Sequence, residues 1–235
     1  MSIKSKSIIN KIKRNNLYFE DLITRSVYHS NKIEGSTLSY AETYSIIFDN
    51  KNKIQVKADP REVFEAVNLK YAINYIMNNA DANISISFIE KIATFINKNI
   101  KDIEKIRKTQ VFITGAEYIP KKPEEVPILL SKLIYKDTKD REEDIFDYIA
   151  RFHIEFEHIH PFEDGNGRTG RVLITKELLN RGLAPVVILV EKRNDYMEYL
   201  AKRDITRLSK MLKKLNEEEI ERMDTFGIKL TKKEK

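Results

Sequence analysis

Cysteine is absent from the 235 residues of the chain, which excludes disulfides and thiolate metal sites. This absence suits a reducing compartment, and we expect a cytoplasmic protein. No apolar run approaches the roughly 18 residues that a membrane-spanning helix needs. The first residues are basic but lack the apolar segment of a signal peptide. We therefore expect a soluble protein without a membrane partner.

Charge of neither sign is scarce. The chain has 42 Lys and Arg residues and 36 Asp and Glu residues, which gives a formal net charge of +6 and a pI of about 9.2. A basic surface can bind the phosphates of nucleic acids. Here, however, lysines alternate with acidic residues, a pattern typical of solvated helix faces. No nucleic-acid recognition motif is evident either, so we expect no nucleic-acid partner.

Glycine is scarce, with seven residues in the whole chain. Three of them, Gly165, Gly167 and Gly170, are close neighbours. A chain with few glycines that places them together needs an unusual backbone conformation or a close approach at that point. This cluster is therefore the first candidate for a functional site.

Apolar residues recur at helical spacing along most of the chain, which predicts an all-α fold. The clearest helix carries one apolar stripe from Ile145 to Ile159. It must end by His160, because Pro161 disfavours helical geometry in the residue before it. We expect helices over about 17–34, from 39, from 59, over 87–99, 126–135, 145–160 and 166–181, and from 194 into the C-terminal region.

Two segments depart from the helical pattern. Residues Thr109–Ile119 are rich in β-forming residues around a glycine, which predicts a short hairpin. Residues Ala184–Val190 are apolar and β-branched, which is typical of a short buried linker or strand. No repeat and no Pro/Gly/Ser-rich linker divides the chain.

The glycine cluster lies between two predicted helices, in the segment HPFEDGNGRTGR from His160 to Arg171. Glycines at 165 and 167 let backbone N–H groups approach an anion, and the N-terminus of the next helix favours phosphate. Arg168 and Arg171 are three residues apart, so both can reach one phosphate chain. Asp164 offers an oxygen ligand for Mg²⁺. The histidine at 160 can accept a proton from an incoming hydroxyl.

Each of these features alone has a simpler explanation. A lone histidine at a helix end is usually a cap, Gly-Asn-Gly is usually a turn, and two arginines on a helix are usually surface charges. Together, however, they supply a phosphate cradle, a metal ligand and a base within one short segment. The combination predicts a phosphate-transfer site.

The segment resembles the signature of the Fic family, His-x-Phe-x-Asp/Glu-Gly-Asn-Gly-Arg-x-x-Arg, at every fixed position. The resemblance extends to the preceding helix with His153 and Phe156 and to the segment TQVFITGAEYIP, and it covers most of residues 20–205. It implies a helical fold with a small β-hairpin flap over the active site. The regions expected on this basis are an N-terminal helical region (1–100), a catalytic core (101–205) and a C-terminal helix with a charged tail (206–235).

The resemblance also implies a reaction. The position of His160 is the general base, which deprotonates a Ser, Thr or Tyr hydroxyl of a protein. The hydroxyl attacks the α-phosphate of ATP, which leaves AMP on the protein and releases pyrophosphate, and the position of Asp164 holds Mg²⁺. Nucleotide-binding roles are implied for Gly165, Asn166, Gly167, Arg168, Arg171 and Tyr196. The implied flap residues, which would hold the target by β-augmentation, are Gly115, Ala116, Glu117 and Tyr118.

A second pattern, Ser-Asn-Lys-Ile-Glu-Gly, closes the predicted helix over about 17–35 with Ser30, Glu34 and Gly35. Alone, a glutamate and a glycine after a helix are commonplace. Upstream of a complete catalytic motif, the pattern resembles the inhibitory signature of Fic proteins with an N-terminal inhibitory helix. The resemblance implies that Glu34 pairs with Arg171 and competes with the γ-phosphate of ATP.

These features predict an autoinhibited protein adenylyltransferase that uses ATP and Mg²⁺. Its partners would be ATP, an unidentified protein target and, through self-modification or a homo-oligomer, other copies of the chain. Three alternatives stay open: removal of AMP, transfer of another nucleotide or phosphate-containing group, and nucleotide sensing without catalysis. The presence of His160 argues against the last, because binding alone needs no base.

Overall fold

The computed structural model describes residues 3–48, 57–103, 105–112, 118–137 and 144–230. These residues form ten α-helices and two short 3₁₀ helices and contain no strand, so the predicted all-α fold is confirmed. The elements are α1 (Ile3–Arg14), α2 (Asn16–Ile33), α3 (Tyr40–Phe48), α4 (Pro60–Asn78), α5 (Ile86–Asn97), η1 (Pro123–Glu125), α6 (Val126–Asp137), α7 (Ile145–Ile159), α8 (Asn166–Arg181), η2 (Val190–Lys192), α9 (Arg193–Ala201) and α10 (Ile205–Thr225).

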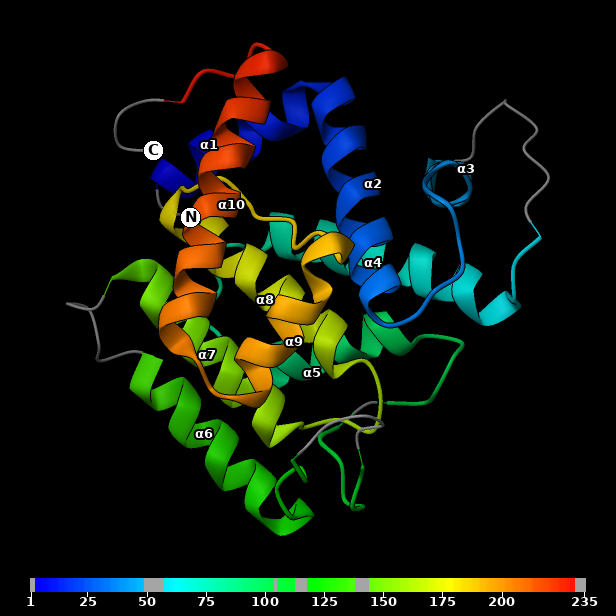
Figure 1. The fold of residues 1–235 in the computed structure, drawn as a ribbon, viewed down its shortest axis with the longest axis vertical. Helices are drawn as coiled ribbons and strands as arrows, with labels where there is room; N and C mark the ends of the chain where they lie inside the picture. Colours follow the sequence, from blue (N-terminus) through cyan, green and yellow to red (C-terminus); the bar gives the residue numbers. More distant parts are fainter. Residues whose placement is uncertain (1–2, 49–56, 104, 113–117, 138–143, 231–235) are drawn as a thin grey trace.

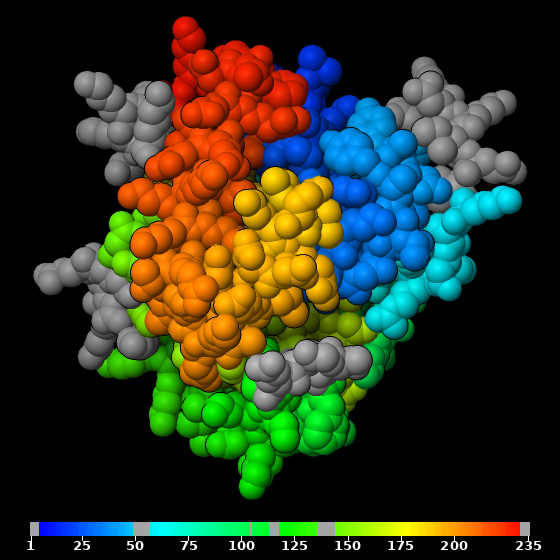
Figure 2. Space-filling model, viewed as in Figure 1, coloured from blue at the N-terminus to red at the C-terminus, as the bar shows by residue number. Residues whose placement is uncertain are grey.

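Helix α8 lies in the middle of the bundle (Figure 1), where α1, α2, α4, α5 and α7 contact it. Helix α7 contacts α8, α6 and α10. On the face shown in Figure 2, α10 in orange and the N-terminal helices in blue flank the yellow segment near residue 190. Helix α8 is therefore enclosed by helices from the N-terminal half of the chain and by α7.

Close packing of α7 on α8 depends on one glycine. The predicted apolar stripe of α7 is buried, as are His153 and Glu157 on the same helix. A Cβ at Gly170 on α8 would lie 2.6 Å from side-chain atoms of both residues. Any larger residue at position 170 would therefore force these side chains or the two helices to shift.

The predicted β-hairpin over Thr109–Ile119 is only partly described. Its centre, with Gly115, Ala116 and Glu117, lies outside the described residues, and residues 105–112 and 118–122 on either side form no strand. The apolar segment that begins at Ala184 is irregular and largely buried. Its first carbonyl accepts a hydrogen bond from the amide of Asn216 on α10 at 2.6 Å, so this segment is a buried linker.

Two predicted helix limits are wrong. Helix α5 begins at Ile86, one residue before the expected Ser87, because the hydroxyl of Ser85 accepts the N–H of Phe88 at 3.1 Å and caps the helix. The helix expected to run on from 194 is interrupted at Arg203, which has a left-handed conformation (φ 53°), and Asp204 caps α10. The first helix, α1, was not predicted at all.

One hydrophobic cluster holds the described residues together. It contains residues from Ile8 in α1 to Ile228 after α10 and draws on all three predicted regions. The division of the chain into those regions stays a prediction. Within the described parts of the chain, none of the helices combines the length and apolar character required to cross a membrane.

A buried ion pair joins α2 to α10. Glu219 on α10 is 4% exposed. Its carboxylate accepts a hydrogen bond from the hydroxyl of Tyr18 at 2.7 Å and two from the guanidinium of Arg25 at 2.6 and 2.8 Å. Replacing it would leave these donors without their acceptor inside the protein.

We therefore expect Glu219→Ala to lower the free energy of unfolding by on the order of 3 kcal/mol, the usual cost of breaking a buried pair from one side. Urea denaturation of the purified protein measures this change. The exposed Glu217 on the same helix is the matched control, and Glu217→Ala should stay within about 0.5 kcal/mol of the wild type. Equal losses in the two variants would show that the pair does not hold α10 in place.

Candidate functional site

The segment between α7 and α8 is fixed by unusual backbone conformations. His160 caps α7 in a left-handed conformation (φ 52°, ψ 64°), as expected of a residue that a proline keeps out of the right-handed helix. Gly165 caps the start of α8, also left-handed (φ 75°). A Cβ there would lie 2.8 and 2.9 Å from side-chain atoms of Asn97 and Ile96 on α5. Only glycine fits this corner.

Asn166 holds the same segment from within. Its side chain is 2% exposed, donates to the carbonyl of Phe162 at 2.8 Å and accepts the N–H of Phe162 at 2.9 Å. Both the oxygen and the nitrogen of the amide thus bind the loop backbone. The predicted nucleotide contact of Asn166 can then come only from its backbone N–H, in the first turn of α8, where N–H groups lack helical partners.

Four charged side chains alternate in sign beside this loop. Asp164 accepts hydrogen bonds from Arg168 at 3.2 Å and from Arg61 on α4 at 2.5 Å. Glu65, one turn after Arg61, lies 3.0 Å from Arg61 and 3.2 Å from Arg168. Arg168 is 3% exposed, and its Nε–H has no hydrogen-bond partner among the described residues. Its Nη1 also lacks a hydrogen-bond partner among these residues, so the guanidinium keeps unused donors.

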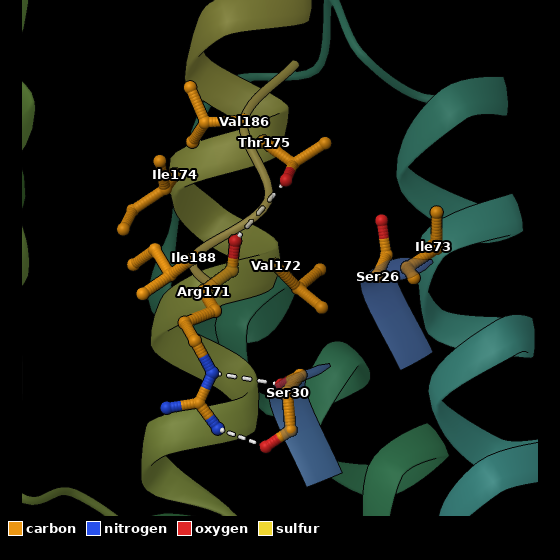
Figure 3. Close-up of a pocket in the computed structure, with 9 residues that line it drawn as sticks. All are labelled: Ser26, Ser30, Ile73, Arg171, Val172, Ile174, Thr175, Val186 and Ile188. Carbon is orange, nitrogen blue, oxygen red and sulfur yellow. Dashed lines mark hydrogen bonds between the residues drawn. The ribbon is translucent and has the colours of Figure 1, made fainter. Parts of the chain in front are cut away.

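Arg171 donates hydrogen bonds to both Ser30 and Glu34 of the predicted inhibitory pattern. Its Nε donates to the hydroxyl of Ser30 at 2.8 Å, and one terminal nitrogen donates to the Ser30 carbonyl at 3.0 Å and to Glu34 at 2.6 Å. Figure 3 shows the guanidinium reaching from α8 to Ser30 on α2, beside a small cavity that Ser26 also lines. Gly35 follows with φ 101° and leaves the helix end free to turn.

The Glu34 carboxylate lies against the first turn of α8. A Cβ at Gly167 would collide with it. Burial alone would raise the pKa of Glu34, but the charge and hydrogen bond of Arg171 outweigh this effect and lower the pKa, so the carboxylate is ionised at neutral pH. An anion of the protein itself therefore sits where a helix N-terminus favours phosphate.

The imidazole of His160 is prepared to accept a proton. Its Nδ1 lies 3.3 Å from the carbonyl oxygen of Glu157, which can only accept, so Nδ1 carries the hydrogen and Nε2 keeps its lone pair. Burial lowers the pKa of His160 to about 4, with Arg107 acting in the same direction. The ring is therefore neutral at physiological pH.

Residues 83–178, which include this whole loop, match the sequence model of the Fic/DOC family. The chain is a Fic/DOC family protein. Over 183 residues it is 33% identical to a protein adenylyltransferase Fic of Culex quinquefasciatus and 32% identical to one of Nematostella vectensis. The matches cover 74% of this chain but only 35% and 42% of those proteins. The chain thus spans well under half the length of these curated relatives.

Solved structures share the fold. A Fic-domain signalling protein of Bacteroides thetaiotaomicron has a TM-score of 0.79 at 20% identity, with 97% of this chain and 100% of that chain covered. A fragment of Fic-1 from C. elegans has a TM-score of 0.75 at 24% identity, with 96% and 66% covered. At these identities the likeness establishes a Fic-type helical fold for the described residues.

Behind Arg171, the Fic/DOC fold of this chain contains a buried polar cluster. Tyr196 on α9 is 0% exposed and its hydroxyl lies 2.7 Å from Nε2 of His153. Burial lowers the pKa of His153 to about 3 and raises the pKa of Glu157 to about 8, so both are neutral at pH 7. The predicted contact of Tyr196 with a nucleotide is not available in this conformation.

The sequence analysis did not predict every residue of the candidate site. Of the predicted flap residues, only Tyr118 is described, and its ring stacks on His158 of α7 at 4.0 Å. Arg61 and Glu65, two of the four charged side chains beside the loop, lie on α4. They are far in sequence from the segment His160–Arg171, and no spacing pattern connects them to it. Glu163, at the variable position before Asp164, accepts a hydrogen bond from Thr109 at 2.8 Å and pairs with Lys101 at 2.8 Å.

The depressed pKa of His160 is open to direct measurement. With a pKa near 4, the imidazole should show no titration between pH 8 and pH 5.5, whereas an ordinary histidine would pass its midpoint near pH 6.5. NMR of protein with ¹³C-labelled histidine follows the ring signals, and loss of one signal in His160→Gln assigns it. A His160 midpoint between pH 6 and 7 would contradict the structure.

Proposed function

We propose that this Fic/DOC protein is an autoinhibited protein adenylyltransferase, which transfers AMP from ATP to a protein hydroxyl. The observation that carries the proposal is the position of Glu34. Its carboxylate pairs with Arg171 of α8 at 2.6 Å and lies against Gly167 in the first turn of that helix, which the loop with His160 precedes. The N-terminus of α8 favours an anion, the Glu34 carboxylate blocks it, and the neutral imidazole of His160 lies in the preceding loop. This arrangement suits an inhibited, nucleotide-dependent reaction.

In the proposed reaction, Nε2 of His160 takes the proton of the target hydroxyl. The hydroxyl oxygen forms a bond to the α-phosphorus, and the bond from that phosphorus to the bridging oxygen breaks. Pyrophosphate leaves with the electron pair. Arg168 and Arg171 stabilise the phosphate charge, together with the N–H groups of the first turn of α8. Bound phosphate also raises the pKa of the nearby imidazole toward the working pH, which strengthens the base.

The residues at the site suit Mg²⁺ bound together with the nucleotide. No group of three or more His, Asp or Glu side chains in the described parts of the chain could hold a metal alone. Asp164 offers a hard carboxylate oxygen that already neutralises a cation, the half-exposed Arg61. Mg²⁺ is typically held by one or two carboxylates and by substrate phosphates. Asp164 would hold the ion, and the ion would neutralise phosphate charge.

The strength of the inhibition depends on the environment of the Glu34–Arg171 pair. Arg171 is only 9% exposed, whereas the Glu34 side chain is 41% exposed. A pair of this kind lies between a surface ion pair, worth about 0–1 kcal/mol, and a buried one. Nucleotide can therefore displace Glu34, at a cost that lowers occupancy about tenfold for each 1.4 kcal/mol.

A second function, removal of AMP from a modified protein, draws on the same observation. A carboxylate beside the phosphate site could orient a water for attack on the AMP ester. Transfer of AMP and hydrolysis of the AMP ester would then share His160 and differ in their need for Glu34.

The proposal predicts that Glu34→Gly raises self-modification at least tenfold, because the variant frees Arg171 for the nucleotide. Intact mass spectrometry after incubation with ATP and Mg²⁺ measures the transfer. A gain of one AMP mass distinguishes nucleotidyl transfer from phosphate transfer and from binding alone. Unchanged modification would show that Glu34 is merely a helix-end carboxylate.

Two control variants belong to the same experiment. In the Glu34→Gly background, His160→Ala should lose at least about 100-fold in rate while ATP binding persists, because only the base is missing. Arg171→Ala should stay slow with or without Glu34, because it removes the inhibitory partner and the phosphate ligand together. Slower release of AMP from pre-modified Glu34→Gly protein would favour the second function.

A further prediction separates the two acidic residues of the loop. Asp164→Ala should abolish the stimulation of AMP transfer by Mg²⁺, because Asp164 is the carboxylate next to the arginine that faces the phosphates. Glu163→Ala should retain a normal Mg²⁺ dependence, since Glu163 contacts Thr109 and Lys101 instead. Mg²⁺ titrations of transfer in the Glu34→Gly background test this, and equal metal dependence of both variants would refute the assignment.

A further inference from the structure

Arg107, in the segment between α5 and η1, is a buried arginine that pairs with none of the acidic residues the structure describes. The residue is 4% exposed, and none of the described carboxylates forms an ion pair with it. Burial lowers the pKa of Arg107, although an arginine stays charged under all ordinary conditions. A buried charge of this kind must be satisfied by hydrogen bonds, or it would destabilise the protein.

Backbone carbonyls supply these hydrogen bonds. The guanidinium donates to the carbonyl of His160 at 2.7 Å, to that of Thr109 at 2.9 Å and to that of Lys121. The backbone N–H of Arg107 donates to the carbonyl of Pro161 at 2.8 Å. One side chain thus joins the end of α7 to two positions that lie twelve residues apart in the sequence.

Those two positions are the ends of the segment 109–121. Other contacts reinforce the same closure. The side-chain amide of Gln110 donates to the carbonyl of Pro120 at 3.2 Å, and the hydroxyl of Thr109 donates to Glu163 in the catalytic loop at 2.8 Å. The ends of the segment are therefore tied to each other and to the backbone that carries the base.

We propose that Arg107 is a positioning residue for AMP transfer, which fixes the general base His160 relative to the ends of segment 109–121. The inference rests on the proposed function, in which Nε2 of His160 takes the proton of the target hydroxyl. The planar guanidinium holds several carbonyls at fixed directions, which the single ammonium of lysine cannot do. Arg107 touches neither nucleotide nor target and acts through the backbone.

The test compares Arg107→Gln and Arg107→Lys, both in the Glu34→Gly background. Because misplacement of a reacting group by about 1 Å can cost about 100-fold in rate, the maximal rate of self-modification should fall by about that factor in Arg107→Gln. Arg107→Lys should recover part of the rate. The Kd for ATP, measured by calorimetry without turnover, should stay within about twofold of the parent, because the phosphate site lies on α8.

Arg25→Gln is the matched control, since it removes a largely buried arginine held by Asp21 and Glu219 away from the loop. It should lower the melting temperature without changing the maximal rate. Full rate in the Arg107 variants, or a loss of ATP affinity in parallel with the rate, would overturn the inference. If Arg107→Gln fails to fold, the rate and affinity of Arg107→Lys decide. Absence of AMP transfer in the Glu34→Gly parent would instead refute the proposed function, and this inference with it.

Discussion

Arg171 is a buried, positively charged residue on α8, a helix that five other helices contact. Other groups of the protein must compensate its charge. Ser30 supplies a hydroxyl and a carbonyl, and Glu34 supplies the opposite charge. Ser30 lies on α2, and Glu34 caps the end of that helix. The packing of α2 against α8 therefore decides whether Arg171 is paired. Any anion that replaces Glu34 must satisfy the same guanidinium, or it leaves a buried charge unpaired.

The rest of the site is held by the backbone more than by side chains. His160 and Gly165 have left-handed backbone conformations, and both side-chain hydrogen bonds of Asn166 are made with the backbone of Phe162. Arg107 donates hydrogen bonds to backbone carbonyls, that of His160 among them. Hydrogen bonds to the backbone fix directions that longer, freely rotating side chains would leave open. Under the proposed function, the base is therefore placed before any substrate binds, as a preorganised site requires.

The sequence predicted best what is local. The motif from His160 to Arg171 is one continuous segment, so its turn, its helix start and its two arginines followed from spacing alone. The Arg61–Asp164 contact did not, because α4 and the loop meet only through the tertiary fold. Helix limits failed where two residues compete for one role, as Ser85 and Ser87 do as caps of α5. Burial of Tyr196 likewise depends on packing that no local pattern encodes.

The charges around the loop are paired in the resting protein: Glu34 with Arg171, and Asp164 with Arg61 and Arg168. Under the proposed function, ATP with Mg²⁺ brings negative and positive charge to the same residues. Phosphate would replace Glu34 as the partner of Arg171, and the metal would replace Arg61 as the partner of Asp164. Each ion pair with the nucleotide or the metal replaces an ion pair within the protein. The net binding free energy is therefore small compared with the energy of any single contact. The exposed end of α2 can therefore decide whether nucleotide binds productively, although the pair it forms is only of moderate strength.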